Sequence, residues 1–575
     1  MQSRWSESEA NKFVELHAED CAEDLALRTY TSRLLGAEES LVLHGGGNTS
    51  VKTSVTNRLG ETIPAIFVKA SGWDMLHISP DGYSGLELEY LLKLRNLPEL
   101  ADDAMVDELR THLLDWRSAT PSIETLVHAF IPQKFIDHTH ADAILALTNQ
   151  LNAKPRIEEA LGSDVALLDY VTPGFKLAKA AAAAYERHPG RRGMVWIKHG
   201  LITWGGTARE SYEAMVELVT RAEQYLDRGA RHAVGVRIAT PIERAQARWR
   251  TVAPVLRGQL AEPSGNPDQP FRRAILQPLI TRKALDFLDS DRGKELALTP
   301  PVTSDHLIRT KPLPLWIDTP DYEDAEKLRL QLSKAVGEYR AAYEAYVARH
   351  SARLSEGVSA FDSLPRVILL PGMGAVGAGR DVRSARIARD ITAHTLDVKA
   401  RIARMAAYEG LLESEIFEME YRPLQHAKVD RGAELPLGRH VALVTGAAGA
   451  VGSAISEALL MQGCHVAITD RAGESLDRFA AELEESYDGW ATSVPLDVTD
   501  PGSVADGFAK VTETWGGVDL VIVNAGAAMV SSLMEMSLEA FRRLERINVE
   551  GSLLVMGEAA RRFKAQGTGG DIVLV

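Results

Sequence analysis

The chain has 575 residues, too many for one hydrophobic core, and its 45% hydrophobic and 25% charged residues are ordinary for a globular protein of about three domains. A net charge of -15 argues against binding to nucleic acid or to an anionic membrane. Two cysteines, Cys21 and Cys464, cannot build a disulfide framework or a cysteine metal site, which suits the reducing cytoplasm. Residues Met1–Glu7 lack the apolar region of a signal peptide and no apolar run is long enough to span a bilayer, so we expect a cytoplasmic protein with small-molecule partners.

Residues 20–235 mix strand and helix patterns and are expected to form an α/β domain. A glycine-rich turn, His44–Ser50, lies near its start, and a second turn of small residues, Lys69–Gly72, follows a strand. Such turns expose backbone N–H groups and hydroxyls that can bind a phosphate. The segment ends in an amphipathic helix that begins with a capping box formed by Thr207 and Glu210.

Three histidines in this segment have the pattern of a metal site. Residues 135–140 read as a strand, and side chains two positions apart lie on one face, so His138 and His140 project together. A third, His199, follows a second strand at Met194–Ile197. Three neutral imidazoles suit Zn²⁺ or a similar divalent ion and leave a coordination position for substrate.

Together with the carboxylate of Glu124 in the preceding Thr120–His128 run, these motifs resemble the class II aldolase/adducin family over residues 20–235. The resemblance implies that His138, His140 and His199 bind zinc, that Glu124 is the catalytic acid/base, and that the substrate phosphate is bound by a further set: Asn48, Ser71, Gly72 and Ser122. Ile123 departs from the family, where fuculose-phosphate aldolases carry a second serine. For His128 we expect a structural role or one that supports a ligand.

Two alternatives remain within this fold. Sugar-phosphate epimerases carry an aspartate where this chain has Glu124, which favours an aldolase. Adducin-like proteins are non-catalytic binding modules that lack the metal set, and the three histidines argue against that class.

Residues 240–430 are mostly helical in pattern, and we expect them to form an extension of the aldolase part. The segment contains a predicted loop at Glu262–Pro270, a long helical stretch from Tyr322 to His350 and one apolar strand at Val367–Leu370. Residues Arg431–Pro436 are predicted to be a linker.

Residues 438–575 have the pattern that opens a doubly wound dinucleotide-binding fold. A buried strand leads into Thr445–Gly452, whose glycines allow a pyrophosphate to approach the start of a helix. A second strand ends in Asp470, whose carboxylate would accept from the ribose hydroxyls and repel a 2′-phosphate, which favours NAD over NADP. Arg471 weakens that preference.

With the later motifs at Leu496–Val498, Val523–Gly526 and Ile547–Val549, this pattern resembles the short-chain dehydrogenase/reductase family. The resemblance places Asn548 in the catalytic relay, and it implies that the cofactor is bound by Thr445, Gly446, Gly449, Gly452, Asp470, Asp497, Val498, Asn524 and Gly526. The chain stops at Asp571–Val575, inside what reads as a strand and without a following turn. The family's catalytic serine and Tyr-x-x-x-Lys would lie beyond Val575. We therefore expect a partial Rossmann domain that belongs to a longer protein.

The combination of an aldolase part with a following dehydrogenase part resembles the bifunctional fusions that cleave rhamnulose 1-phosphate and oxidise the resulting aldehyde. It implies metal-dependent cleavage of a ketose 1-phosphate to dihydroxyacetone phosphate and an aldehyde, coupled in the full-length protein to NAD-dependent oxidation. Both families commonly form tetramers, so the resemblance also implies a homo-oligomer.

Overall fold

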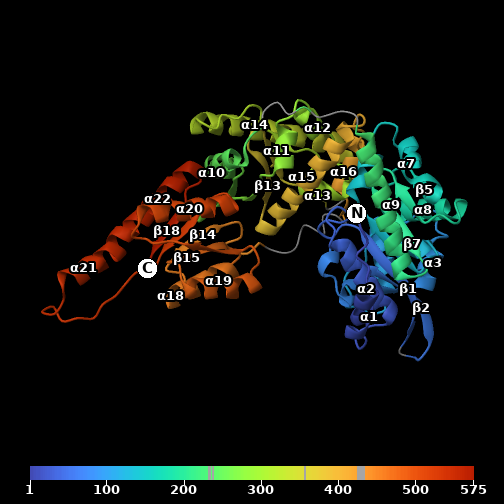
Figure 1. Ribbon diagram of the computed structural model, residues 1–575, viewed down its shortest axis with the longest axis horizontal. Helices are drawn as coiled ribbons and strands as arrows, with labels where there is room; N and C mark the ends of the chain where they lie inside the picture. Colours follow the sequence, from blue (N-terminus) through green and yellow to red (C-terminus); the bar gives the residue numbers. More distant parts are fainter. Residues whose placement is uncertain (58, 231–234, 236–238, 355–357, 424–433) are drawn as a thin grey trace.

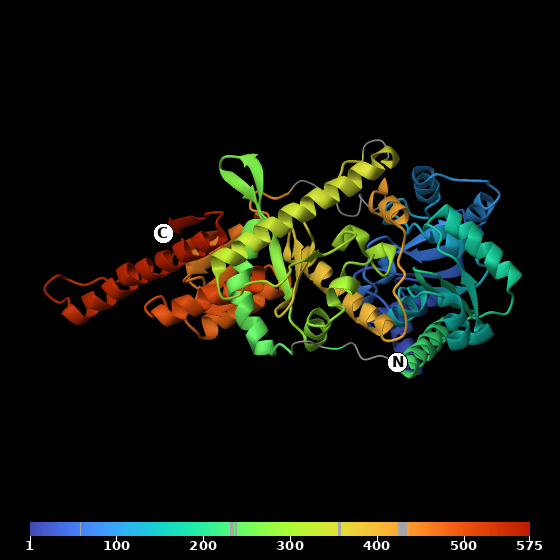
Figure 2. The ribbon, with the colours of Figure 1, turned by 90° about the horizontal axis from the view of Figure 1, so that it is seen from above.

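The computed structural model describes the chain from residue 1 to 575 apart from residues 58, 231–234, 236–238, 355–357 and 424–433. The molecule is elongated, as Figures 1 and 2 show, with the N-terminal α/β part at one end and the C-terminal α/β part at the other. The segment that follows residue 240 lies between them. The predicted linker Arg431–Pro436 falls partly outside the described residues.

The N-terminal part is built on a seven-stranded sheet in the order β3-β2-β1-β4-β7-β6-β5, in which only β5 and β6 pair in parallel. Its strands are β1 (Asn48–Thr56), β2 (Thr62–Lys69), β3 (Tyr83–Glu87), β4 (Phe135–Thr139), β5 (Val165–Leu168), β6 (Gly193–Trp196) and β7 (Gly200–Gly205). Its helices are α1 (Glu7–Leu16), α2 (Glu23–Gly36), α3 (Leu88–Leu94), α4 (Asp102–Thr111), α5 (Thr125–Phe130), α6 (Asp142–Thr148), α7 (Ala153–Leu161), α8 (Phe175–Arg187) and α9 (Ala208–Gly229).

Helix α9 begins and packs as its sequence predicts. The Thr207 hydroxyl accepts from the Glu210 N–H at 3.1 Å, and the Glu210 carboxylate accepts from the Thr207 N–H at 3.2 Å, which confirms the capping box. The predicted apolar face is buried, and it comprises Tyr212, Met215, Val216, Val219, Ala222 and Leu226.

The middle segment contains more strand than the sequence indicates. Helices dominate it: α10 (Ile242–Gln259), α11 (Arg282–Leu288), α12 (Gly293–Ala297), α13 (Leu307–Thr310), α14 (Ala325–His350), α15 (Val382–Ala403) and α16 (Glu413–Glu420). The predicted strand is present, and it belongs to a four-stranded sheet in the order β10-β13-β12-β11. These strands are β10 (Ile275–Leu279), β11 (Leu315–Trp316), β12 (Val367–Leu370) and β13 (Gly374–Gly379). The prediction of a loop at Glu262–Pro270 was wrong, because β8 (Glu262–Asn266) and β9 (Gln269–Arg272) pair there as a hairpin.

The C-terminal part has a parallel five-stranded sheet in the order β16-β15-β14-β17-β18, the doubly wound pattern that the sequence predicts. Its strands are β14 (Val441–Thr445), β15 (His465–Asp470), β16 (Ala491–Pro495), β17 (Leu520–Val523) and β18 (Asp571–Leu574). Its helices are α18 (Ala450–Met461), α19 (Glu474–Ser486), α20 (Pro501–Trp515), α21 (Leu538–Glu545) and α22 (Ser552–Gln566), and a π-helical turn at Arg546–Gly551 joins the last two.

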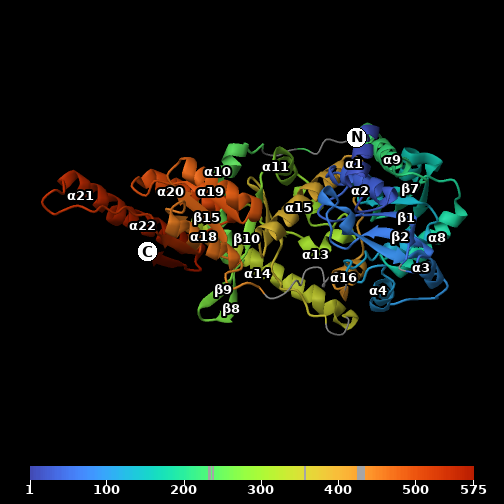
Figure 3. The ribbon, with the colours of Figure 1, turned by 90° about the horizontal axis from the view of Figure 1, so that it is seen from below.

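The middle segment packs tightly on both ends of the molecule, and Figure 3 shows α13 and α15 on the side that faces the N-terminal sheet. On that side, Val302, Val398 and Ile402 are buried in the same apolar cluster as residues of α6 and α9. On the other side, Arg257 of α10 forms a buried ion pair with Asp519, at 2.6 Å, ahead of β17.

Among the described residues, no helix has the length and apolar character needed to cross a membrane.

Candidate active sites

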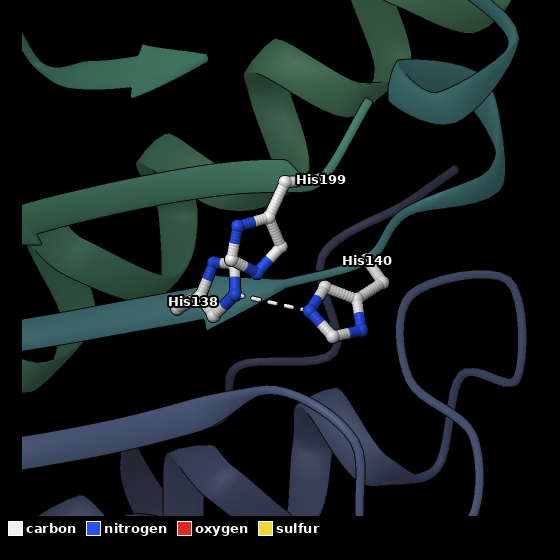
Figure 4. A group of neighbouring side chains, drawn as sticks. All are labelled: His138, His140 and His199. Carbon is white, nitrogen blue, oxygen red and sulfur yellow. Dashed lines mark hydrogen bonds between the residues drawn. The ribbon is translucent and has the colours of Figure 1, made fainter. Parts of the chain in front are cut away.

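The three predicted histidines meet in the structure. His138 is near the end of β4, His140 lies just after it, and His199 lies in the turn between β6 and β7, with nitrogen atoms of all three rings within 4.8 Å of one another. Figure 4 shows the rings converging, with the Nε2 atoms of His138 and His140 at 3.1 Å. The antiparallel pairing of β4 with β7 brings the distant His199 to the other two.

The chemistry of these rings fits a divalent metal. Burial lowers the pKa of His138 to about 4 and that of His140 to about 3, so both rings are neutral at neutral pH, as a ligand must be. His138 Nδ1 donates to the Leu201 carbonyl at 3.0 Å, which leaves Nε2 as its ligand atom. Three imidazoles with ligand atoms this close match the three-histidine sites in which a position stays open.

Glu124 lies directly beside the histidines. Its Oε1 is 3.2 Å from Nε2 of His199, and its Oε2 is 3.7 Å from Nε2 of His138. Burial alone would raise the pKa of Glu124, but the facing histidines, His138 and His199 foremost, hold it well below its usual range. The side chain is therefore an ionised carboxylate that can accept a proton.

The glycine-rich turn is held against the histidine strand. Asn48 begins β1 and pairs with His138 of β4. Gly47 has a φ of +64°, and a Cβ there would lie 2.6 Å from the His138 carbonyl oxygen, so the turn needs a glycine for this approach. Lys69 donates to the carbonyls of Gly45, at 3.0 Å, and Trp73, at 2.8 Å, and so ties the two small-residue turns together.

One pocket unites the predicted groups. It is lined by the expected phosphate contacts Asn48, Ser71, Gly72 and Ser122, by Ile123, by Glu124 and by two of the histidines, His140 and His199. The Ser122 hydroxyl accepts from the Glu124 N–H at 3.2 Å, so this serine also shapes the start of α5.

His128 lies outside the pocket. It is fully buried, and its Nδ1 lies 2.8 Å from the Ser50 hydroxyl.

The middle segment completes this pocket, which decides between the two roles that its sequence leaves open, a structural insertion or a part in shaping the site. Ser304, Asp305 and Met419 line it, and Asp305 Oδ2 lies 3.6 Å from Nδ1 of His140. The acidic and histidine-containing run Asp305–Pro312 is the one signal in the sequence that could have pointed here, because such residues cluster at metal and catalytic sites.

The predicted cofactor residues of the C-terminal part gather at the carboxyl edge of the parallel sheet, where open α/β sheets bind ligands. Thr445, Asp470 and Asn524 end or follow the neighbouring strands β14, β15 and β17. The Asn524 side chain donates to the carbonyls of Thr445, at 3.0 Å, and Gly446, at 3.1 Å. The Asp470 carboxylate accepts from the Ala448 N–H at 3.2 Å, which places it beside the glycine turn.

The glycines of this turn allow close packing. Gly446 has a φ of +65°, and a Cβ on Gly452 would lie 2.2 Å from the Gly446 carbonyl oxygen. Gly449 is the N-cap of α18, so the helix begins at the turn. The N-terminus of α18 therefore faces the place where a pyrophosphate would lie.

The remaining predicted residues border the same edge. Asp497 Oδ1 accepts from the Thr499 N–H at 2.9 Å, and Val498 is buried against Gly551. Asn548 is exposed, and its side chain exchanges two hydrogen bonds with the backbone of Ala527, at 2.8 and 2.9 Å, next to Gly526.

Comparison with known families agrees with this geometry. Three families match the chain: "Class II Aldolase and Adducin N-terminal domain" over residues 27–226, "Aldolase class II, second domain" over residues 247–429, and "short chain dehydrogenase" over residues 440–575. The oxidoreductase YuxG of Bacillus subtilis (strain 168) is 33% identical over 553 residues, which are 95% of this chain and 79% of that protein. The chain belongs to this family of class II aldolase–short-chain dehydrogenase fusions.

Other relatives match one part of the fusion. Sorbitol dehydrogenase of Cereibacter sphaeroides is 36% identical over 132 residues, which are 23% of this chain and 50% of that enzyme. The N-terminal class II aldolase domain of a conserved protein from Thermoplasma acidophilum is 38% identical, with 39% of this chain and 99% of that chain covered and a TM-score of 0.36. This chain spans about half the length of the sorbitol dehydrogenase that it matches.

Proposed function

We propose that the aldolase part cleaves a ketose 1-phosphate of the rhamnulose 1-phosphate type, with a bound zinc ion, to dihydroxyacetone phosphate and an aldehyde. The observation that supports this most is the meeting of three histidines and one ionised carboxylate at a pocket lined by two turns of small residues. When bound to His138, His140 and His199, the ion would act as a Lewis acid that stabilises the negative charge developing on the substrate oxygens.

Glu124 is the proposed acid/base. Its carboxylate is ionised and lies within 3.2 Å of a ligand nitrogen, so a substrate held beside the histidines is within its reach. As the carbon–carbon bond breaks, the carboxylate would take the proton from the hydroxyl of the carbon that becomes the aldehyde and pass it to the carbon of the dihydroxyacetone phosphate half. The hydrogen bond from Asn48 to Oε2, at 2.5 Å, orients the carboxylate for this transfer.

The turns at His44–Ser50 and Lys69–Gly72 are proposed to hold the phosphate. Asn48, Ser71, Gly72 and Ser122 present amide, hydroxyl and backbone N–H donors along the pocket. Holding the phosphate there fixes the reacting carbons relative to Glu124, which is a positioning effect.

The C-terminal part is proposed to bind NAD and to use it in oxidising the aldehyde that the aldolase part releases. The glycine turn at the start of α18 and the carboxylate of Asp470 support the cofactor assignment. Asn548 is the proposed member of the catalytic relay in this chain.

A panel of phosphorylated ketoses, with dihydroxyacetone phosphate as the measured product, tests the aldolase assignment. We expect cleavage of 1-phosphates with six-carbon deoxyketose chains and none of the unphosphorylated sugars. Inversion of the configuration at one carbon of a sugar phosphate, with no net carbon–carbon cleavage, would instead favour the epimerase alternative, which shares this fold.

A further inference from the structure

Asp305 is a residue of the middle segment that lies in the pocket of the aldolase part. It belongs to the 3₁₀ turn Ser304–His306, and it lines the pocket together with Ser304 and Met419. The pocket is therefore shaped by two segments of the chain whose nearest lining positions, His199 and Ser304, are 105 residues apart.

The turn that carries Asp305 is firmly seated on the aldolase part. Val302 is 1% exposed and belongs to the apolar cluster that includes residues of α6 and α9. The Asn149 side chain, at the end of α6, donates to the Val302 carbonyl at 2.8 Å. The Thr303 hydroxyl accepts from the Asp305 N–H at 3.5 Å. Packing and hydrogen bonds on the N-terminal side of its turn thus hold Asp305 in place.

The carboxylate of Asp305 faces one nitrogen of His140, and the other nitrogen of that ring faces His138. Oδ2 of Asp305 is 3.6 Å from Nδ1 of His140, while Nε2 of His140 is 3.1 Å from Nε2 of His138. Contacts of this kind are often long before a ligand is bound and tighten when it is.

The glycine-rich turn leaves room for this approach. A Cβ on Gly46 would lie 3.3 Å from Asp305 Oδ2, a tight contact, and 3.5 Å from His140 Nδ1, so the glycine-rich turn packs directly against this pair.

We infer that Asp305 is a positioning residue for His140. It accepts the Nδ1–H of the ring, fixes the tautomer and orientation, and keeps Nε2 available as a metal ligand. The inference rests on the proposed metal site, and it assigns the middle segment a part in the aldolase reaction that follows from where it packs.

Zinc affinity of the full chain, measured by competition with a chromophoric chelator, tests this inference without any sugar phosphate. Loss of a carboxylate that orients a ligand histidine costs roughly 10–100-fold in metal affinity, and we expect a loss of that size in Asp305→Ala. Asp305→Asn keeps an oxygen that can accept the Nδ1–H, so we expect it to recover most of the affinity. The visible spectrum of the Co²⁺-loaded protein should change in Asp305→Ala and resemble the wild type in Asp305→Asn.

Asp390 provides a matched control. Its carboxylate also comes from the middle segment and also contacts a histidine of the aldolase part, His44, at 2.9 Å, but His44 is not one of the three clustered histidines. We expect Asp390→Ala to bind zinc as the wild type does. An unchanged affinity in Asp305→Ala, an equal loss in Asp390→Ala, or an Asp305→Asn variant as weak as Asp305→Ala would each overturn the inference. If no ketose phosphate is cleaved but Asp305→Ala still binds zinc more weakly, the proposed substrate is wrong and the positioning role stands.

Discussion

Asn48 donates a 2.5 Å hydrogen bond to Oε2 of Glu124, and this contact joins the glycine-rich turn to the proposed acid/base. Asn48 is also the strand partner of His138. One residue therefore connects the glycine-rich turn, the three histidines and the carboxylate, so a phosphate bound at the turn would be fixed relative to the proposed acid/base.

Glu124→Gln should separate proton transfer from metal binding. The amide keeps the size of the side chain and can still contact His199, but it cannot accept a proton, so we expect cleavage to fall by about 10²–10⁴-fold. Zinc content should stay at the wild-type level. Steady-state release of dihydroxyacetone phosphate together with metal analysis makes the comparison, and near-normal turnover would move the acid/base role to another residue.

Asp470→Asn should shift the cofactor preference of the dehydrogenase part. Removing a negative charge beside the 2′-position of the adenosine ribose relieves repulsion of a 2′-phosphate, an effect of about 1.4 kcal/mol or roughly tenfold. The ratio of NADPH to NADH dissociation constants, measured by fluorescence titration, should fall by that factor. Asp477→Asn, an exposed carboxylate on α19, should leave the ratio unchanged, and a shift of equal size there would contradict the assignment.

Asp519 stabilises the contact between the middle segment and the dehydrogenase part. It binds Arg257 at 2.6 Å and Arg273 at 3.0 Å, and Asp519→Asn leaves both buried cations without their counter-charge, which costs about 3–5 kcal/mol of unfolding free energy. Burial alone would raise the pKa of Asp519, but Arg257 and Arg273 lower it to about 2. The stabilisation is therefore present above the ordinary pKa of about 3.9 and is lost as the pH falls toward 2.

Chemical denaturation at pH 7 and at pH 3 measures this effect. The difference between wild type and Asp519→Asn should be large at pH 7 and smaller at pH 3. Glu513→Gln, which removes the exposed pair with Arg250 at the same contact, should cost less than about 1 kcal/mol. Equal costs for the two variants at pH 7 would contradict the argument.

Glu420 should make the protein less stable as the pH rises through neutrality. Burial raises its pKa to about 7, despite hydrogen bonds from Tyr343, at 2.8 Å, and Tyr346, at 3.0 Å. The protonated form is favoured in the folded state, so its contribution is full below the unfolded pKa of about 4.3 and is lost as the pH rises through 7. The free energy of unfolding of Glu420→Gln, relative to that of the wild type, should therefore increase from pH 5 to pH 8.5. Glu418→Gln, an exposed neighbour, should show no such trend. A pH-independent difference for Glu420→Gln would show that the carboxyl does not titrate in this range.

The meeting of the three histidines could be predicted from the sequence because local rules determine most of it. Strand alternation places His138 and His140 on one face, and the glycine after His199 marks the turn that brings the third ring in. Asp305 could not be placed in this way, because the packing of Val302 into the aldolase core brings it to the site, and no local pattern encodes that packing.

The strand β13 shows why the sheet of the middle segment was not predicted. Its sequence, Gly374–Gly379, is rich in glycine, which is unfavourable in strands by intrinsic preference. Helix α15 explains the composition: a Cβ on Gly377 would lie 2.3 Å from the Ala385 carbonyl oxygen, and one on Gly379 would lie 2.5 Å from the Ala385 nitrogen. The glycines serve the close approach of helix and strand, a tertiary requirement that overrides strand propensity.

Metal dependence of the cleavage reaction tests the central claim most directly. The protein as purified should contain about one divalent ion per chain, as a three-histidine site implies, and chelation should abolish release of dihydroxyacetone phosphate from rhamnulose 1-phosphate until zinc is restored. The His138→Ala/His140→Ala double variant should neither hold the ion nor cleave the sugar phosphate after zinc is added. Full metal retention by the double variant, or undiminished cleavage by the chelated wild type, would contradict a metal-dependent aldolase built on these three histidines.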